Sequence, residues 1–211
     1  MSLDKALETY KDYFNNKVEL YGATPSAVDY NGVEAQWVRF EQLTKVIDPS
    51  APFTIIDYGC GYGALLDFLQ NKNWQFEYCG FDMLENMVRV GREAHAGILN
   101  THFEHSEHKL ETVDYLIACS IFNNKFEAEE NEWQDRVLQT LWQMNTLCSK
   151  GFSFDILTKY SDEERMAQRP DLFFADPLFF FDYCKRNFSR NVRLLHDYDL
   201  YDFTILVRKS M

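Results

Sequence analysis

Asp57-Tyr58-Gly59-Cys60-Gly61-Tyr62-Gly63 is the stretch that decides the fold, because it joins a strand-like run to a helix-like run through three closely spaced glycines. The β-branched segment 53–57 before it predicts a short strand, and the apolar spacing of 64–69 after it is typical of a helix. Glycine has no Cβ, so such a turn can adopt positive φ angles and let a ligand approach the backbone. The stretch therefore predicts a ligand site at the turn.

Strand-like and helix-like segments alternate along the rest of the chain. Further strands are predicted over 76–81, 101–105, 113–119, 152–156, 191–195 and 201–207. Helices are predicted over 3–20, 32–47, 84–95 and 132–148, the last with Gly151 just past its end, and a loop and helix extend to about residue 185. This order predicts an α/β fold whose parallel sheet ends in an antiparallel hairpin.

Length and composition favour one cytoplasmic domain. The 211 residues suit a single domain with a modest addition, and no apolar run approaches the roughly 18 residues of a membrane helix. The chain begins without the features of a secretory signal, so a cytoplasmic location is expected. A net charge of -12 disfavours nucleic acid as a partner, because that binding relies on clustered Lys and Arg.

No metal site or disulfide framework is predicted. The five cysteines contain no C-x-x-C pair. Four histidines lie close in sequence, but their spacing and the charged residues between them fit a solvated strand end better than a metal cluster; they are His95, His102, His105 and His108.

Asp82 is the second part of the predicted site. It directly follows the strand over 76–81, where a carboxylate can accept hydrogen bonds from both hydroxyls of a ribose. The alternative role for Asp82 is to cap the helix that follows. Capping alone does not explain its pairing with the glycine turn, so we favour ribose binding.

The pattern Asp-x-Gly-x-Gly-x-Gly at 57–63, followed by Gly80-Phe81-Asp82, resembles motifs I and II of the class I S-adenosylmethionine-dependent methyltransferases. The resemblance covers residues 50–209. It implies a Rossmann-like sheet of seven strands, mostly parallel with an antiparallel last strand, and helices on both faces. The two helices predicted within 1–48 lie outside it, and we expect them to form a cap on the same single domain of residues 1–211.

The resemblance also implies S-adenosylmethionine as the cofactor. Asp82 would hold its ribose, and Met83 would lie against its adenine. The turn would wrap the methionine part through Asp57, Gly59, Cys60, Gly61 and Gly63.

Two later strand ends complete the site that the resemblance implies. Ser106 or Glu107, after the third strand, would contact the adenine, although the usual Asp of the family is missing there. Cys119, at the end of the fourth strand, occupies the position where the family approaches the sulfonium. Asn123 follows and is a candidate to face the acceptor. The segment 118–123 departs from the Asn-Pro-Pro-Tyr type motif of enzymes that methylate exocyclic or amide nitrogens.

Two further residues are candidates for the chemistry. His196 ends the sixth strand, where an imidazole oriented by Asp197 can act as a general base; a surface histidine in a hairpin is the alternative. Arg39, on the second predicted helix, is expected to reach the carboxylate of the cofactor.

Three cations follow the fifth strand and are candidates to bind an anionic acceptor, with a solvated helix face as the alternative; they are Lys159, Arg165 and Arg169. The segments 169–177 and 195–198 also resemble a group of bacterial methyltransferases with no established acceptor. We expect a small-molecule acceptor, with neither nucleic acid nor membrane as a partner.

Two other functions compete with methyl transfer. A nicotinamide-dependent oxidoreductase also fits the glycine pattern, but Asp57 would lie near the pyrophosphate of a dinucleotide and repel it. A non-catalytic module that binds the cofactor is the second alternative, because a fold alone does not establish catalysis.

Overall fold

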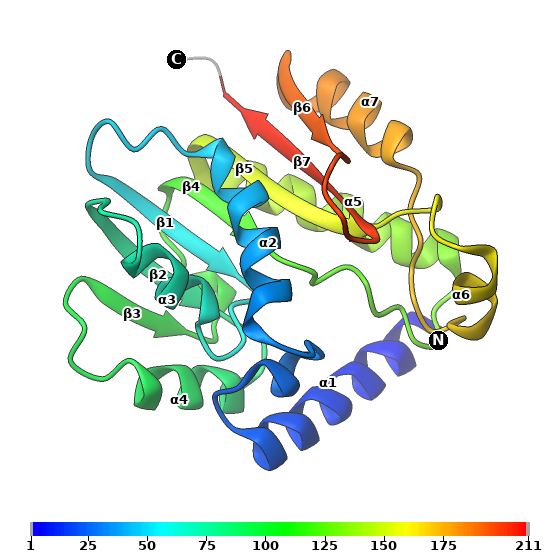
Figure 1. Cartoon of the computed structure of the whole chain (residues 1–211), viewed down its shortest axis with the longest axis horizontal. Helices are drawn as coiled ribbons and strands as arrows, with labels where there is room; N and C mark the ends of the chain where they lie inside the picture. The colour runs from blue at the N-terminus through cyan, green and yellow to red at the C-terminus, as the bar shows by residue number, and fades with distance from the viewer. Residues whose placement is uncertain (1, 210–211) are drawn as a thin grey trace.

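Seven strands form one mostly parallel sheet in the computed structural model, which describes residues 2–209 (Figure 1). The strands are β1 (Phe53–Tyr58), β2 (Phe76–Phe81), β3 (Thr101–Glu104), β4 (Val113–Ala118), β5 (Cys148–Leu157), β6 (Asn191–Leu195) and β7 (Asp202–Arg208). Their order is β3-β2-β1-β4-β5-β7-β6, and within the described residues only β7 runs antiparallel to its neighbours. The predicted Rossmann-like sheet is confirmed.

Helices cover both faces of the sheet. Successive side chains of a strand point to opposite faces, so Ile55 packs with Leu43 in one apolar cluster while Ile56 packs with Met144 in another. The first face carries α2 (Val33–Leu43), α3 (Ala64–Gln70) and α4 (Glu85–Ala94), and the second carries α5 (Glu130–Leu147) and α7 (Pro177–Asn187). Within residues 2–209, no helix is long and apolar enough to cross a membrane.

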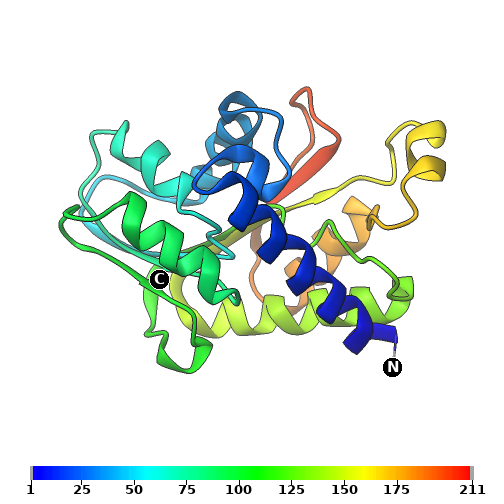
Figure 2. The same ribbon diagram turned by 90° about the horizontal axis from the view of Figure 1, so that it is seen from below.

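The N-terminal segment lies across the edge at which the parallel strands end. Helix α1 (Ser2–Tyr21) runs diagonally over this edge in Figure 2 and leads into the short 3-10 helix η1 (Pro25–Val28). Phe14 and Val18 of α1 pack against Leu84 and Met87 beside the start of α4. Because this contact is apolar, it holds α1 above the end of β2.

One predicted boundary is wrong. Gly151 was expected to follow a helix ending at Cys148, but α5 ends at Leu147 and β5 begins at once, with Gly151 inside the strand. A Cβ atom on Gly151 would lie 2.5 Å from the carbonyl oxygen of Val207 on β7. The glycine therefore permits a close approach of two strands and does not end the helix.

Three short elements complete the chain. They are the 3-10 helices η2 (Thr44–Val46) and η3 (Glu107–Lys109), and helix α6 (Glu163–Gln168), which follows β5. Figure 1 shows α6 on the same side of the molecule as the N-terminus of α1.

Candidate functional site

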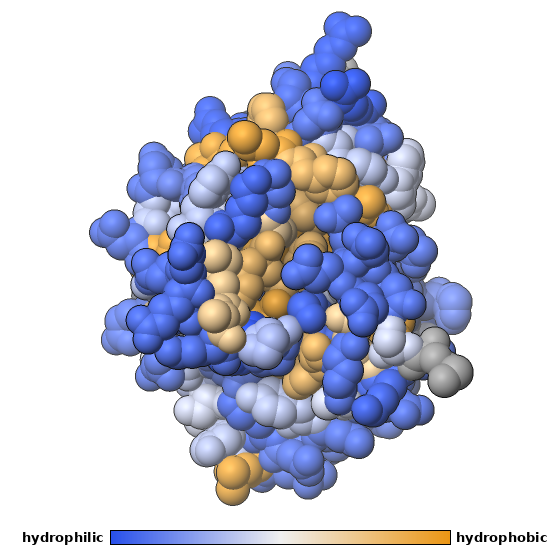
Figure 3. All heavy atoms as spheres, turned by 90° about the vertical axis from the view of Figure 1, so that its right-hand side faces the viewer, coloured by the Kyte–Doolittle hydropathy of each residue, from blue (hydrophilic) through white to orange (hydrophobic). Residues whose placement is uncertain are grey.

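Two adjoining cavities lie at the carboxyl edge of the parallel strands. The larger has a volume of about 410 Å³ and the smaller about 290 Å³, and four residues line both: Tyr10, Gly59, Asp82 and Ile121. Figure 3 looks onto this side of the molecule, where a hollow with hydrophobic side chains inside is bordered by hydrophilic ones. Open α/β sheets bind ligands at this edge, so the cavities are the candidate site.

The glycine turn forms the floor between the cavities. Gly59 and Gly61 line the larger cavity. Their backbone φ angles are 80° and 53°, values that residues other than glycine rarely adopt. A Cβ atom on Gly61 would lie 2.8 Å from Cγ1 of Val28. Gly63 has a different role, because a Cβ there would lie 2.9 Å from the rings of His95 and Phe103. The first two glycines thus expose backbone to the cavity, and the third allows packing beneath it.

Asp82 links the turn to the end of β2. One carboxylate oxygen accepts a hydrogen bond from the Gly61 amide and the other from the Leu84 amide, both at 2.9 Å. Each oxygen retains a lone pair for a ligand that donates two hydrogen bonds, as a ribose does. Burial raises the pKa of Asp82 to about 6, so its carboxylate is mostly ionised at neutral pH. Asp82 therefore orders the turn before α4 and also lines both cavities.

Two of the predicted turn contacts lie behind the turn. Asp57 is buried and accepts a 2.7 Å hydrogen bond from the hydroxyl of Tyr78, and burial raises the pKa of Asp57 to about 7. Cys60 is buried with its sulfur 3.0 Å from the place of a Cβ on Gly80. Neither residue is among the described residues that line the cavities. In the structure, both residues are packed beneath the turn and do not face the cavities.

The smaller cavity contains two of the residues expected near the adenine. Met83 is 39% exposed and lines the cavity, as does Glu107, whose carboxylate accepts a hydrogen bond from the hydroxyl of Tyr58. Ser106 is absent from the described lining, and its amide donates to the Glu104 carboxylate. Apolar side chains supply much of the remaining wall, namely Leu7, Phe81, Phe122, Trp133 and Val137. This cavity suits a flat apolar ring with polar edges.

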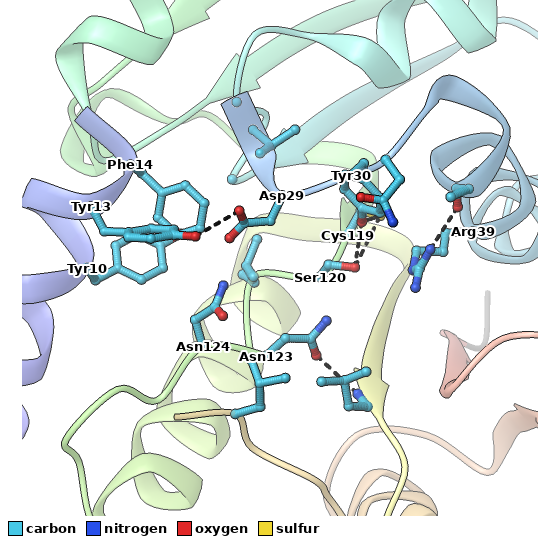
Figure 4. A pocket seen from close by; sticks show the side chains of 18 of the residues that line it. Tyr10, Tyr13, Phe14, Asp29, Tyr30, Arg39, Cys119, Ser120, Asn123 and Asn124 are labelled. Carbon is cyan, nitrogen blue, oxygen red and sulfur yellow. Dashed lines mark hydrogen bonds between the residues drawn. The ribbon is translucent and has the colours of Figure 1, made fainter. Parts of the chain in front are cut away.

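The larger cavity is bounded by segments far apart in the sequence. Figure 4 shows Tyr10, Tyr13 and Phe14 of α1 on one side, and Asn123 and Asn124 across from them. The side-chain oxygen of Asn123 accepts a 3.1 Å hydrogen bond from the Leu157 amide, which fixes the orientation of the carboxamide. Asn123 therefore lies in the lining of the larger cavity, and its contact with an acceptor stays a prediction.

Arg39 has partners that the sequence did not reveal. Its guanidinium pairs with the buried carboxylates of Asp155, at 3.5 Å, and Asp202. The same side chain lines the larger cavity, and its charge lies 5.1 Å from the ring centre of Tyr30. Because two carboxylates already balance this cation, the structure does not offer Arg39 as an uncompensated charge for a cofactor carboxylate.

His196 and Cys119 differ in their relation to the cavity. His196 is exposed, with its ring 6.0 Å from the ring of Tyr160, and it is not among the described residues lining either cavity. The chain between β6 and β7 contributes Leu200 and Tyr201 there instead. Cys119 lines the larger cavity, and burial raises the pKa of its thiol well above the usual value. The structure therefore brings Cys119 and Asn123 together and leaves His196 apart.

The three candidate cations also differ in whether they line the larger cavity. Lys159 pairs with Asp176 at 2.7 Å and is not part of the described lining. Arg165 and Arg169 line the larger cavity, with Arg165 lying 4.4 Å from the ring centre of Tyr201. Within residues 2–209, no three His, Cys, Asp or Glu side chains are arranged to hold a metal ion.

Sequence reasoning expected an N-terminal cap but did not identify the tyrosines that it brings to the site, nor one buried acid. Tyr10, Tyr13 and Tyr30 line the larger cavity, and the first two belong to the helix predicted over 3–20. Asp155 is fully buried at the end of β5. The signal that could have identified Asp155 is a carboxylate inside the apolar run 152–157.

Comparison with known proteins finds a relative that matches most of the chain. The chain is 43% identical over 166 residues to a Mycobacterium tuberculosis protein named "Putative methyltransferase Rv1506c", covering 79% of this chain and 99% of that protein. No family model matches the chain.

Solved structures share the fold at low sequence identity. DhpI, in a complex with SAM and HEP, aligns with a TM-score of 0.63 at 10% identity over 99% of this chain and 98% of its own. The N-methyltransferase NodS from Bradyrhizobium japonicum aligns with a TM-score of 0.61 at 12% identity, over 95% of this chain and 100% of its own. Human N-acetylserotonin methyltransferase aligns at 0.61 and 14% identity over 85% of this chain, which spans 55% of that enzyme.

The glycine turn, Asp82 directly after β2 and the strand order are thus found together with 43% identity to the protein named "Putative methyltransferase Rv1506c". The chain belongs to the class I S-adenosylmethionine-dependent methyltransferases.

Proposed function

We propose that this protein transfers a methyl group from S-adenosylmethionine to a small-molecule acceptor held in the larger cavity. The observation that carries the proposal is that Gly59 and Asp82 line both cavities, so that one ligand can extend along the turn from one into the other. The larger cavity, at about 410 Å³, lies within the roughly 300–1,000 Å³ range of ligand pockets, and the smaller, at about 290 Å³, lies just below it.

The residues at the junction fit the cofactor. The ionised Asp82 would accept hydrogen bonds from the ribose, and the smaller cavity would take the adenine between apolar walls, with Met83 and Glu107 beside it. The exposed backbone of Gly59 and Gly61 would lie along the methionine part, close to Cys119. Asp57, Cys60 and Gly63 would support the turn from behind.

When bound, S-adenosylmethionine supplies a methyl group on a positively charged sulfur. The protein must then align the acceptor and exclude water. The aromatic side chains of α1 suit this task, because Tyr10 and Phe14 line the larger cavity opposite Asn123. We therefore propose that residues 1–48 cap the site and form one functional domain with residues 50–209.

Three observations support a small acceptor. The cavity combines aromatic rings with polar groups such as Asp29 and Asn124, as sites for small polar molecules do. The net charge of -12 offers no general attraction to nucleic acid. One structurally similar protein is named for a small acceptor, N-acetylserotonin. Arg165 and Arg169 are the proposed contacts for any anionic group.

Two measurements test the proposal. Calorimetry should show S-adenosylhomocysteine binding more tightly than NAD or NADP, and the reverse order would overturn the cofactor assignment. Labelled S-adenosylmethionine should then transfer its label to a small molecule from a metabolite extract and not to RNA, DNA or protein. Binding without transfer to any of these would favour a non-catalytic module, and labelled nucleic acid would contradict the acceptor class.

A further inference from the structure

A chain of three hydrogen-bonded groups leads from the larger cavity to a buried carboxyl. The hydroxyl of Tyr30 donates to Oγ of Ser120 at 2.7 Å, and Oγ of Ser120 donates to Oδ2 of Asp155 at 3.1 Å. Figure 4 shows Tyr30 and Ser120 side by side at the wall of the cavity, which both residues line. Asp155 lies behind them and is fully buried.

Ser120 is held in an unusual conformation by this acid. Its φ angle of 57° lies in the left-handed region, which costs a residue other than glycine free energy. Asp155 compensates by accepting from the Ser120 amide at 2.5 Å as well as from the hydroxyl. Strain of this kind persists where the surroundings impose it and is concentrated at functional sites.

The surroundings of Asp155 favour proton exchange near neutral pH. Burial and the nearby carboxylate of Asp202 raise the pKa of Asp155 to about 7, while the positive charge of Arg39 opposes this effect. Both neighbours come from other elements, Asp202 from β7 and Arg39 from α2. The other titratable groups that interact with Asp155 are Tyr30, Cys119 and Tyr198.

We propose that Tyr30, Ser120 and Asp155 form a proton relay, and that the acceptor is a hydroxyl compound or a protonated amine that must lose a proton on methylation. The bond from methyl carbon to sulfur breaks as the bond from methyl carbon to the acceptor atom forms. The acceptor proton passes to the Tyr30 oxygen, the Tyr30 proton to Ser120, and the Ser120 proton to Oδ2 of Asp155. Asp155 then returns its proton to water after the products leave. This inference rests on the proposed methyl transfer.

Other groups near the cavity are less suited to accept the proton. His196 is not in the described lining, and the raised pKa of Cys119 keeps it as a thiol. Asp29 already accepts hydrogen bonds from Tyr13 and Lys17. Tyr30 is the group that would touch the acceptor, whereas Ser120 and Asp155 act through it and are positioning residues.

A spectroscopic titration tests the relay without any acceptor. The infrared band of protonated carboxyl groups is followed against pH in the full chain and in Asp155→Asn. Asp57 and Asp82 contribute equally to both spectra, and the charge of Asp202 interacts with that of Asp155, so the difference should show the titration of this pair, with Asp155 losing its proton near pH 7. Ser120→Ala removes a donor to the charged form and should raise that midpoint. A difference spectrum with Asp155 ionised throughout would overturn the proposal.

An activity assay tests the relay in turnover. Labelled S-adenosylmethionine is offered with four separate pools of simple compounds, namely alcohols and phenols, amines, carboxylates, and thiols. Label should enter the alcohol or amine pool, and Tyr30→Phe, Ser120→Ala and Asp155→Asn should each lower the rate by roughly 10²-fold or more. The rate of the unmodified protein should rise with pH through about 7, and Asp155→Asn should abolish that rise.

Two matched variants control for the loss of a buried hydroxyl. Tyr115→Phe and Ser153→Ala remove hydroxyls that bond to Asp48 and Leu43, away from both cavities, and should leave the rate unchanged. Unchanged rates in the relay variants, or label only in carboxylates or thiols, would refute the relay. If the unmodified chain fails to bind S-adenosylhomocysteine, the proposed function itself fails, so the two failures are distinct.

Discussion

The carboxylate of Asp82 accepts a 2.9 Å hydrogen bond from the backbone amide of Gly61, which joins the end of β2 to the turn after β1. Its other oxygen accepts from the amide of Leu84. A side chain expected to act either as a cap or as a ligand contact therefore orders the loop before α4 and remains at the junction of the two cavities.

Replacing Asp82 should weaken cofactor binding. Asp82→Ala is expected to cost roughly 1.5–3 kcal/mol of S-adenosylhomocysteine affinity, because it removes hydrogen bonds to a charged group. Asp82→Asn keeps the shape and one acceptor oxygen, so its loss should be smaller. Calorimetry measures the affinity, and circular dichroism shows whether the variants stay folded. Equal affinity in all three folded proteins would remove Asp82 from the ligand contacts.

A side chain at Gly61 should distort the turn. Gly61→Ala combines a φ of 53° with a Cβ only 2.8 Å from Val28, so we expect a loss of about 1–3 kcal/mol of unfolding free energy together with weaker cofactor binding. Gly22→Ala is the matched control, because Gly22 has a φ of 60° but no atom within 4 Å of its added Cβ. If the two alanine variants lose equal stability, the contact with Val28 is irrelevant. Val28→Ala added to Gly61→Ala should recover part of the loss.

Stability should fall as the pH rises towards 7. The pKa of Asp57 is about 7 in the folded protein and near 3.8 when exposed, so the folded state binds the proton more tightly. This contribution is complete below pH 3.8 and is lost as the pH rises through about 7; a difference of this size corresponds to about 4 kcal/mol. Urea unfolding across this pH range measures the slope. Asp57→Asn should reduce the slope of the unfolding free energy against pH. An unchanged slope would show that protonation of Asp57 does not contribute to the pH dependence of stability.

Removal of α1 should weaken cofactor binding more than it weakens the fold. Of its buried residues, Ala6 packs in the cluster on the second sheet face, whereas Phe14 and Val18 belong to a small separate cluster; Tyr10 lines both cavities. Deleting residues 1–22 should reduce S-adenosylhomocysteine affinity by roughly tenfold, about 1.4 kcal/mol. Leu20→Ala, at a residue that is 72% exposed, is the control and should bind normally. A folded truncated protein with full affinity would contradict the capping role.

Much of the fold could be predicted because its signals are local. The continuous β-branched run around Ile55 and Ile56 indicates a strand buried on both faces, and the helical spacing of 64–69 needs only its own residues. The positive φ angles at Gly59 and Gly61 depend on a missing Cβ, which the sequence states directly. The role of Gly151 was predicted wrongly because a glycine is needed there to let Val207, a residue distant in sequence, approach closely.

The sequence by itself determined the strand, turn and helix around Gly59 and the acid at Asp82, since glycine conformation and residue periodicity act over a few positions. Only the tertiary structure decided which distant groups meet. Arg39 pairs with Asp202, and Tyr30 reaches Ser120 and through it Asp155, because α2, η1 and the strand ends are packed at one edge of the sheet. Burial then sets the charge of these groups, and burial is a property of the packed chain that no local pattern contains.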